Sequence, residues 1–109
     1  LNNLRVLNYL KNVLKLSGSQ HDDWYRHWIK QGFVALEAML KTGGTGKFSH
    51  GDMPTLADIC LVPQVFNAKR FNTEAELRPA YPTIFKVFDE CMKHPAFDAA
   101  RPEKQPDNE

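Results

Sequence analysis

Residues 52–66 contain a helix-start signal followed directly by a segment that is apolar on nearly every side. Thr55 and Asp58 have the spacing of a capping box, in which the third residue after the cap bonds back to the cap's backbone N–H. Here Asp replaces the usual Glu. A helix that is apolar all round belongs in the centre of its domain. We therefore expect a buried central helix over about residues 55–71, bent at Pro63.

Proline and glycine divide the rest of the chain. All seven prolines lie at or after Pro54, and all six glycines lie at or before Gly51, so long uninterrupted helices fit the first half best. Apolar residues recur at helical spacing in residues 1–16 and again to about Lys41, with Ser19 as the expected cap of the second helix. The stripe predicted to be buried on that helix comprises Trp28, Ile29, Gly32, Phe33, Leu36, Met39 and Leu40. Gly32 costs about 1 kcal/mol of helix propensity relative to alanine, which would be tolerated if another backbone packed closely there.

The second half predicts shorter helices. Thr73 begins one that Pro79 ends, and Pro82 opens another over residues 83–93, followed by a short turn over 96–100. No segment alternates apolar and polar residues as a strand does. The sequence predicts an all-α bundle over residues 1–100. The polar residues 101–109 read as an extended or disordered C-terminal tail.

Charge and cysteine usage narrow the function classes. The chain carries 14 Lys and Arg against 13 Asp and Glu, which gives no support for a nucleic-acid partner. Its apolar runs are too short to span a bilayer, so we expect no membrane partner. Cys60 and Cys91 form neither a CxxC pair nor a disulfide framework, which favours a reducing, cytoplasmic compartment. We expect both to lie in the core.

Few residues point to a chemical site. His21, Asp22, Asp23 and His27 lie close in sequence, but acidic residues at a helix start suit the helix dipole, and no further ligands complete a metal site. Asn2 and Asn3 either cap the first helix or present amides to a ligand. Arg70 and Lys69 either complement a helix C-terminus or bind a carboxylate, for which Arg offers a planar fork.

Several segments resemble a known family. Residues 52–58 resemble the capping motif in the helical C-terminal domain of cytosolic glutathione transferases. The stretches that are similar to the zeta class, the maleylacetoacetate and maleylpyruvate isomerases, are residues 1–7, 32–37, 57–65, 67–71 and 105–107. The resemblance runs the whole chain, and the capping motif within it is shared by many transferase classes.

The resemblance implies a domain organisation and a cofactor. In the family an N-terminal thioredoxin-like domain binds most of glutathione and activates its thiol. Neither its Ser and Cys motif nor its βαβ pattern occurs in this sequence, so the catalytic residues are expected outside residues 1–109. The chain also begins at Leu1 without Met, and we expect it to be the C-terminal part of a longer protein. A homodimer is also implied.

The resemblance further implies a reaction and site residues. In the family the glutathione thiolate adds to the cis double bond of a small dicarboxylic keto acid. The resulting single bond rotates, and elimination releases the trans isomer. Arg70 matches the arginine that pairs a substrate carboxylate, and Asn2 or Asn3 matches a residue that contacts glutathione. Some bacterial members carry a second Arg where this chain has Leu4.

Two other functions remain open from the sequence. A general glutathione transferase could act on small α-halo acids. A helical domain of this kind could also serve as a non-catalytic adaptor. The presence of Arg70 with the Asn pair favours an enzyme over an adaptor, because an adaptor has no need of these side chains, and an assay with both substrate types would separate the isomerase from the general transferase.

Overall fold

The structure is a computed structural model that describes residues 4–108. Within this range the chain is helical and contains no strand, and a single bridge joins Thr45 to Gly51 in the loop after the second helix. The predicted all-α class is therefore confirmed. The helices are α1 (Leu4–Asn12), α2 (Gly18–Thr42), α3 (Leu56–Lys69), α4 (Glu74–Ala80), α5 (Pro82–Lys93), α6 (Pro95–Ala99) and the 3-10 helix η1 (Pro102–Lys104).

The junction between α1 and α2 differs from the prediction. α1 ends at Asn12, and Lys15 adopts a positive φ of 55°, which turns the chain. α2 is capped by Ser17, not Ser19. The Ser17 hydroxyl accepts the Gln20 N–H at 3.3 Å, while Gln20 Oε1 accepts the Ser17 N–H at 3.0 Å. Ser-x-x-Gln is itself a capping box, so the sequence contained this signal.

The buried face of α2 is also displaced from the predicted stripe. Met39 is 67% exposed and Trp28 is 42% exposed, so these two predictions were wrong. No heavy atom lies within 4 Å of a Cβ built on Gly32, so no close backbone contact within the described chain accounts for a glycine there. The residues that are buried follow a spacing of three or four: Tyr25, Ile29, Phe33, Glu37 and Leu40.

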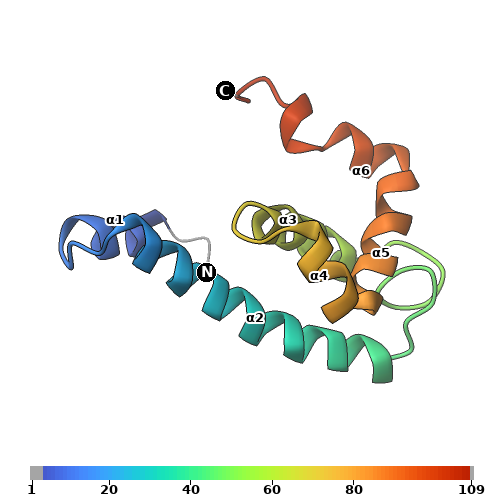
Figure 1. Ribbon diagram of the computed structural model, residues 1–109. Helices are drawn as coiled ribbons and strands as arrows, with labels where there is room; N and C mark the ends of the chain where they lie inside the picture. Colours follow the sequence, from blue (N-terminus) through green and yellow to red (C-terminus); the bar gives the residue numbers. More distant parts are fainter. Residues whose placement is uncertain (1–3, 109) are drawn as a thin grey trace.

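α5 occupies the centre of the described chain. It contacts α2, α3, α4 and α6 (Figure 1). Ile84, Val87 and Cys91 on its inner face are completely buried. The prediction for Cys91 is thereby confirmed. α3, which we expected at the centre, buries one face against α5 and leaves the other exposed. Cys60 lies on that exposed side, so its prediction as a core residue was wrong.

The C-terminal residues fold back instead of extending away. η1 follows α6, and Gln105 Nε2 donates to the carbonyl oxygens of Ala99 and Arg101, each at 3.0 Å. The expected extended tail is therefore ordered over residues 102–105. In Figure 1 this segment runs across the open side of α3 and forms a second wall beside it. No described helix is long and apolar enough to cross a membrane.

Candidate functional site

The N-terminal end of α3 is anchored by one buried carboxylate. Asp58 is fully buried, and its Oδ2 accepts the Thr55 N–H at 2.8 Å, as the capping pattern predicted. Its Oδ1 accepts the Ser49 N–H, also at 2.8 Å, which ties the preceding loop to the helix. Burial alone would raise the pKa of Asp58, but these N–H donors hold it below its usual value. The carboxylate therefore stays charged.

The C-terminal end of α3 carries two cations with different surroundings. Lys69 Nζ lies 2.9 Å from Glu74 Oε2 and is thus already paired. Arg70 caps the helix with its backbone, has an exposed side chain, and forms no ion pair with any carboxylate of residues 4–108. Its guanidinium carbon lies 6.0 Å from the centre of the Phe71 ring. Arg70 is therefore available for an external anion.

An aromatic cluster of His21, Tyr25 and Phe71 lies beside Arg70. The rings of Tyr25 and Phe71 stack with centroids 4.1 Å apart and planes 10° apart, and His21 lies 5.4 Å from Tyr25. Arg26 Nε donates to the Phe71 carbonyl oxygen at 2.7 Å, which joins α2 to the end of α3. Burial raises the pKa of Tyr25, and the positive charge on Arg70 opposes that rise.

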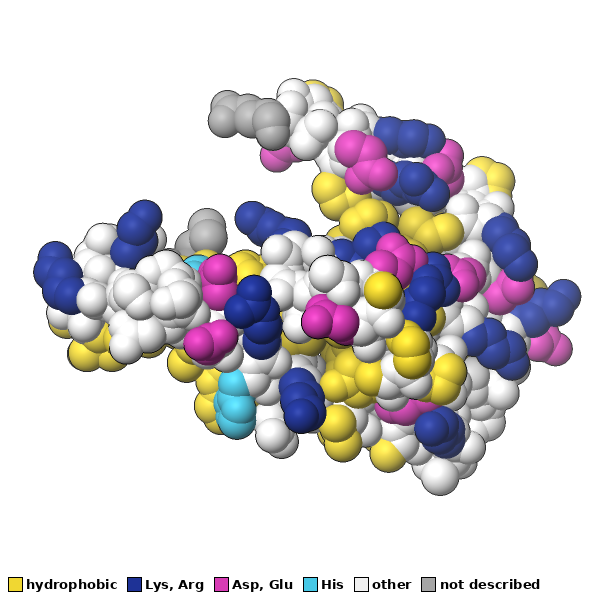
Figure 2. Space-filling model, viewed as in Figure 1, with side chains coloured by type: hydrophobic (Ala, Val, Ile, Leu, Met, Phe, Trp, Pro, Cys, Tyr) yellow, Lys and Arg dark blue, Asp and Glu magenta, His cyan; other side chains and the backbone are white. Residues whose placement is uncertain are grey.

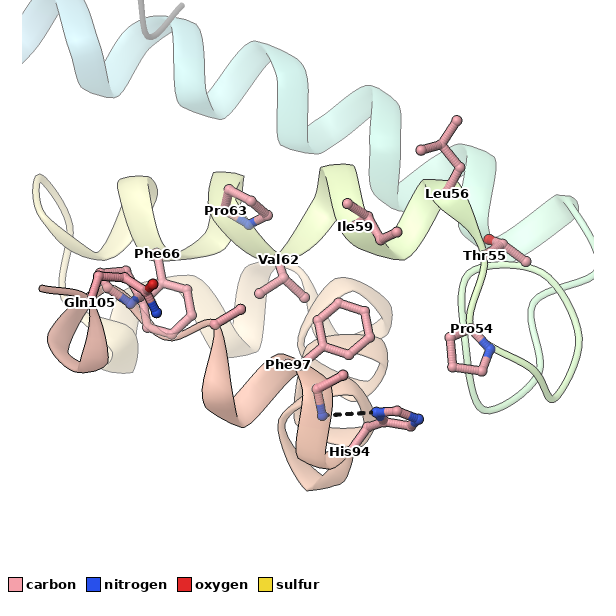
Figure 3. Close-up of a pocket in the computed structure, with 13 residues that line it drawn as sticks. Pro54, Thr55, Leu56, Ile59, Val62, Pro63, Phe66, His94, Phe97 and Gln105 are labelled. Carbon is pink, nitrogen blue, oxygen red and sulfur yellow. Dashed lines mark hydrogen bonds between the residues drawn. The ribbon is translucent and has the colours of Figure 1, made fainter.

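An apolar groove of about 710 Å³ follows the exposed side of α3. Figure 2 shows a hollow between the C-terminal segment and the body of the molecule, with hydrophobic side chains on its walls. On α3 Leu56 and Ile59 are 74% and 60% exposed. Figure 3 shows Val62, Phe66 and Phe97 directed toward the space between α3 and α6. The groove reaches Phe66, about one helical turn before Arg70.

His94 stabilises the far wall of this groove. Its Nδ1 accepts the Ala96 N–H at 3.2 Å and so caps α6, the contact drawn as a dashed line in Figure 3. The ring also meets Phe97 edge-on, with centroids 6.0 Å apart. Sequence analysis did not assign this role, because a two-residue cap by His is not among the usual helix-start signals.

Of the predicted ligand-binding residues the structure describes only Arg70, which lies beside the Phe71 ring of the aromatic cluster. Asn2 and Asn3 lie outside the described residues. No three His, Cys, Asp or Glu side chains within the described chain are grouped so as to hold a metal ion. The stack of Tyr25 on Phe71 was not predicted from the sequence. The spacing of four residues from Tyr25 to Ile29 and from Ile29 to Phe33 is the signal that places Tyr25 on the buried face.

The helical fold and the capping box at the start of α3 agree with the transferase-type helical domain that the sequence resembles. Residues 22–90 match the family model of the glutathione S-transferase C-terminal domain. The chain therefore belongs to this family.

Individual relatives show which class of this family the chain resembles most. The chain is 42% identical over 107 residues to a probable maleylacetoacetate isomerase of Vibrio cholerae, covering 98% of this chain and 48% of the relative. It is 40% identical, with a TM-score of 0.90, to a maleylpyruvate isomerase structure described as a bacterial zeta-class transferase, covering 99% of this chain and 50% of that one. The resemblance to the zeta class is thus confirmed.

A third comparison includes bound ligands. The chain is 44% identical, with a TM-score of 0.85, to the maleylacetoacetate isomerase of Anaeromyxobacter dehalogenans, solved with dicarboxyethyl glutathione and citrate in its active site. The match covers 98% of this chain and 46% of that structure. The chain accordingly spans about half the length of the relatives it matches.

Proposed function

We propose that this chain is the substrate-binding C-terminal half of a glutathione-dependent cis–trans isomerase that acts on maleylacetoacetate or maleylpyruvate. The observation that carries the proposal is Arg70, an exposed arginine with no carboxylate partner among residues 4–108, at the end of a firmly anchored helix. Similarity to isomerases at about 40% identity along nearly the whole chain supports it.

Arg70 is well supported for binding a substrate carboxylate. Val65 and Ala68, in the last turns of α3, are completely buried, and Asp58 fixes the other end of the helix. A side chain on such a support is held more precisely than one on a mobile loop. The helix C-terminus carries partial negative charge, which favours a cation but repels a bound anion. Arg70 therefore binds its anion beyond the helix end.

Glutathione is the proposed cofactor. An N-terminal thioredoxin-like domain binds most of it and supplies the thiol-activating group, while Asn2 or Asn3 adds a contact from this half. The thiolate then adds to the cis double bond of the keto acid, the resulting single bond rotates, and elimination returns the thiolate. Within this cycle Arg70 holds a carboxylate that does not react, so that the double bond stays beside the sulfur.

The N-terminal domain is proposed to dock on the apolar groove. Its α3 side exposes Leu56 and Ile59 to a degree that is costly in water. A domain docked on the groove covers these side chains and brings glutathione to the end of the groove nearest Arg70. A cytoplasmic homodimer is the assembly proposed for the full-length protein.

An assay of the full-length protein tests the proposal. We expect glutathione-dependent conversion of maleylacetoacetate or maleylpyruvate to the trans isomer. An α-halo acid assayed in parallel distinguishes the general transferase. Turnover of the halo acid without isomerisation would contradict the proposal, and absence of both activities would favour the adaptor.

A further inference from the structure

The backbone turn that carries Arg70 is held only in part by α3 itself. The Arg70 N–H donates to the Asn67 carbonyl oxygen at 3.1 Å, and the Phe71 N–H donates to that of Ala68 at the same distance. The last carbonyl groups of a helix have no acceptor role left within that helix. The Phe71 carbonyl lies beyond these bonds, so α3 alone does not fix the direction of the chain directly after Arg70.

Arg26 of α2 supplies the missing contact from outside α3. Its Nε donates to the Phe71 carbonyl oxygen at 2.7 Å, a hydrogen bond between residues 45 positions apart in the chain. Its Nη1 donates to Asp23 Oδ1 at 3.2 Å, about one turn earlier on α2. A hydrogen bond from a charged donor is roughly twice as strong as one between neutral groups. Arg26 therefore fixes the backbone of the residue that follows Arg70.

The Phe71 side chain is held by the same helix. Its ring stacks on that of Tyr25, which precedes Arg26 on α2. The Arg70 guanidinium carbon lies 6.0 Å from the centre of the Phe71 ring, at the outer limit of a cation–π contact. Because α2 holds Phe71 by both its carbonyl and its ring, the Arg70 side chain lies against a surface that is itself fixed.

The surroundings of the two arginines give them different roles. The Nε and Nη1 atoms of Arg26 are engaged with Phe71 and Asp23. Arg70 has an exposed side chain and no carboxylate partner among residues 4–108. Arg70 is therefore the arginine that is available to an external anion, whereas Arg26 is committed to contacts within the chain.

We propose that Arg26 is a positioning residue for the substrate carboxylate, on which it acts through the Phe71 carbonyl and Arg70. The proposal rests on the proposed function of Arg70. A planar fork grips both oxygens of a carboxylate only in the correct orientation, and a misplacement of about 1 Å can cost on the order of a hundredfold in rate. Without Arg26 the turn after α3 would be free to move, and ordering Arg70 would then consume part of the binding free energy.

Calorimetric titration of full-length protein with maleate tests the proposal. S-methylglutathione, which has no thiol to add to the double bond, is kept saturating so that only binding is measured. We expect Arg26→Ala to weaken maleate binding about three- to thirtyfold, the range for a residue that acts through another. Arg26→Lys retains a charged donor for the Phe71 carbonyl and should recover part of the lost affinity.

Lys30 provides the matched control. It carries the same charge about one turn later on α2, is exposed, and has no ion pair within residues 4–108. Lys30→Ala removes a cation without touching the turn after α3, and should bind maleate as the wild type does. Should Arg26→Ala fail to fold, Arg26→Gln and Lys30→Gln are compared by the same criteria.

A double-mutant cycle separates positioning from an independent effect on stability or charge. In an Arg70→Lys background, Arg26→Ala should cost clearly less affinity than in the wild type, because the flexible Lys does not depend on the orientation of a fork. Equal losses in both backgrounds, unchanged maleate affinity in Arg26→Ala, an equal loss in Lys30→Ala, or no maleate binding by the wild type would overturn the proposal. Maleate binding that depends on Arg26 through Arg70 in a protein without isomerase activity would support the positioning role and refute only the proposed reaction.

Discussion

Arg70 is the residue on which the proposed substrate site depends. Arg70→Lys should keep the fold and lower kcat/KM for the dicarboxylic substrate about ten- to a hundredfold, because Lys cannot reproduce the planar fork. Arg70→Ala should lose at least as much. Steady-state kinetics of the full-length protein, with thermal melts alongside, measure both effects.

The neighbouring cation is the control for this experiment. Lys69 is already paired with Glu74, and its Nζ lies 5.6 Å from the centre of the Phe88 ring. Lys69→Ala should therefore change kcat/KM little. Normal turnover by Arg70→Ala, or an equal loss in Lys69→Ala, would show that Arg70 only complements the helix C-terminus and does not bind the substrate specifically.

Asp58 controls stability rather than binding. Asp58→Ala removes the acceptor of the Thr55 and Ser49 N–H groups and should destabilise the domain by about 0.5–2 kcal/mol. Chemical denaturation of both proteins measures the difference. An unchanged denaturation midpoint would show that the capping contacts do not contribute to the free energy of unfolding.

The same carboxylate predicts a pH dependence. Because its folded pKa is lowered, the stability that Asp58 contributes is fully present above its unfolded pKa of about 3.9. That stability is lost as the pH falls through the lower, folded value. Asp58→Asn should therefore flatten the acid limb of the stability curve relative to wild type. If the stability of both proteins fell in parallel at acid pH, the ionisation of Asp58 would not be the cause of the pH dependence.

At the scale of elements, α2 caps α5 across the interior. Tyr81 precedes α5 without a side-chain cap, and Glu37 of α2 accepts the first N–H groups instead. Glu37→Gln leaves one carbonyl oxygen for two donors, so we expect a loss of about 1–3 kcal/mol, the cost of an unsatisfied buried group. Denaturant midpoints measure it, with the exposed Glu103→Gln as control. Equal midpoints for the two variants would contradict the tertiary cap.

Sequence patterns located most elements because the relevant signals are local. Thr55, Thr73 and Pro82 mark the starts of α3, α4 and α5 correctly, since a cap and its partner lie within four residues. The Glu37 cap joins residues that are far apart in the chain. A glutamate is usually exposed, and nothing in the local sequence pattern indicates that Glu37 is buried.

The errors in the site have the same origin. Cys60 and Ile59 are apolar residues of α3 that the sequence places in a core, yet both are exposed in this chain. An apolar run predicts a helix that is covered on every side, but it does not indicate whether the same chain or a partner covers it. The stack of Tyr25 on Phe71, the residue next to Arg70, could not be predicted either, because it depends on how α2 packs against the end of α3.

At the scale of the whole molecule, the exposed side of α3 predicts how residues 1–109 behave alone. The groove beside it measures about 710 Å³ and is lined mainly by apolar side chains. A surface of this kind marks an interaction site. The isolated chain should therefore bind an apolar dye such as ANS, and the full-length protein should bind much less of it if the proposed N-terminal domain covers the groove.

The same division predicts the activity of the isolated chain. Residues 1–109 should bind glutathione poorly and should not isomerise maleylacetoacetate, because the thiol-activating group is proposed to lie in the other half. Calorimetry with glutathione and an isomerase assay measure both, and full-length protein serves as the positive control. Circular dichroism of the chain alone establishes that it is folded, so that inactivity is not the result of unfolding. Micromolar glutathione affinity of residues 1–109 would show that this half contains the main cofactor site and would overturn the proposed division of labour.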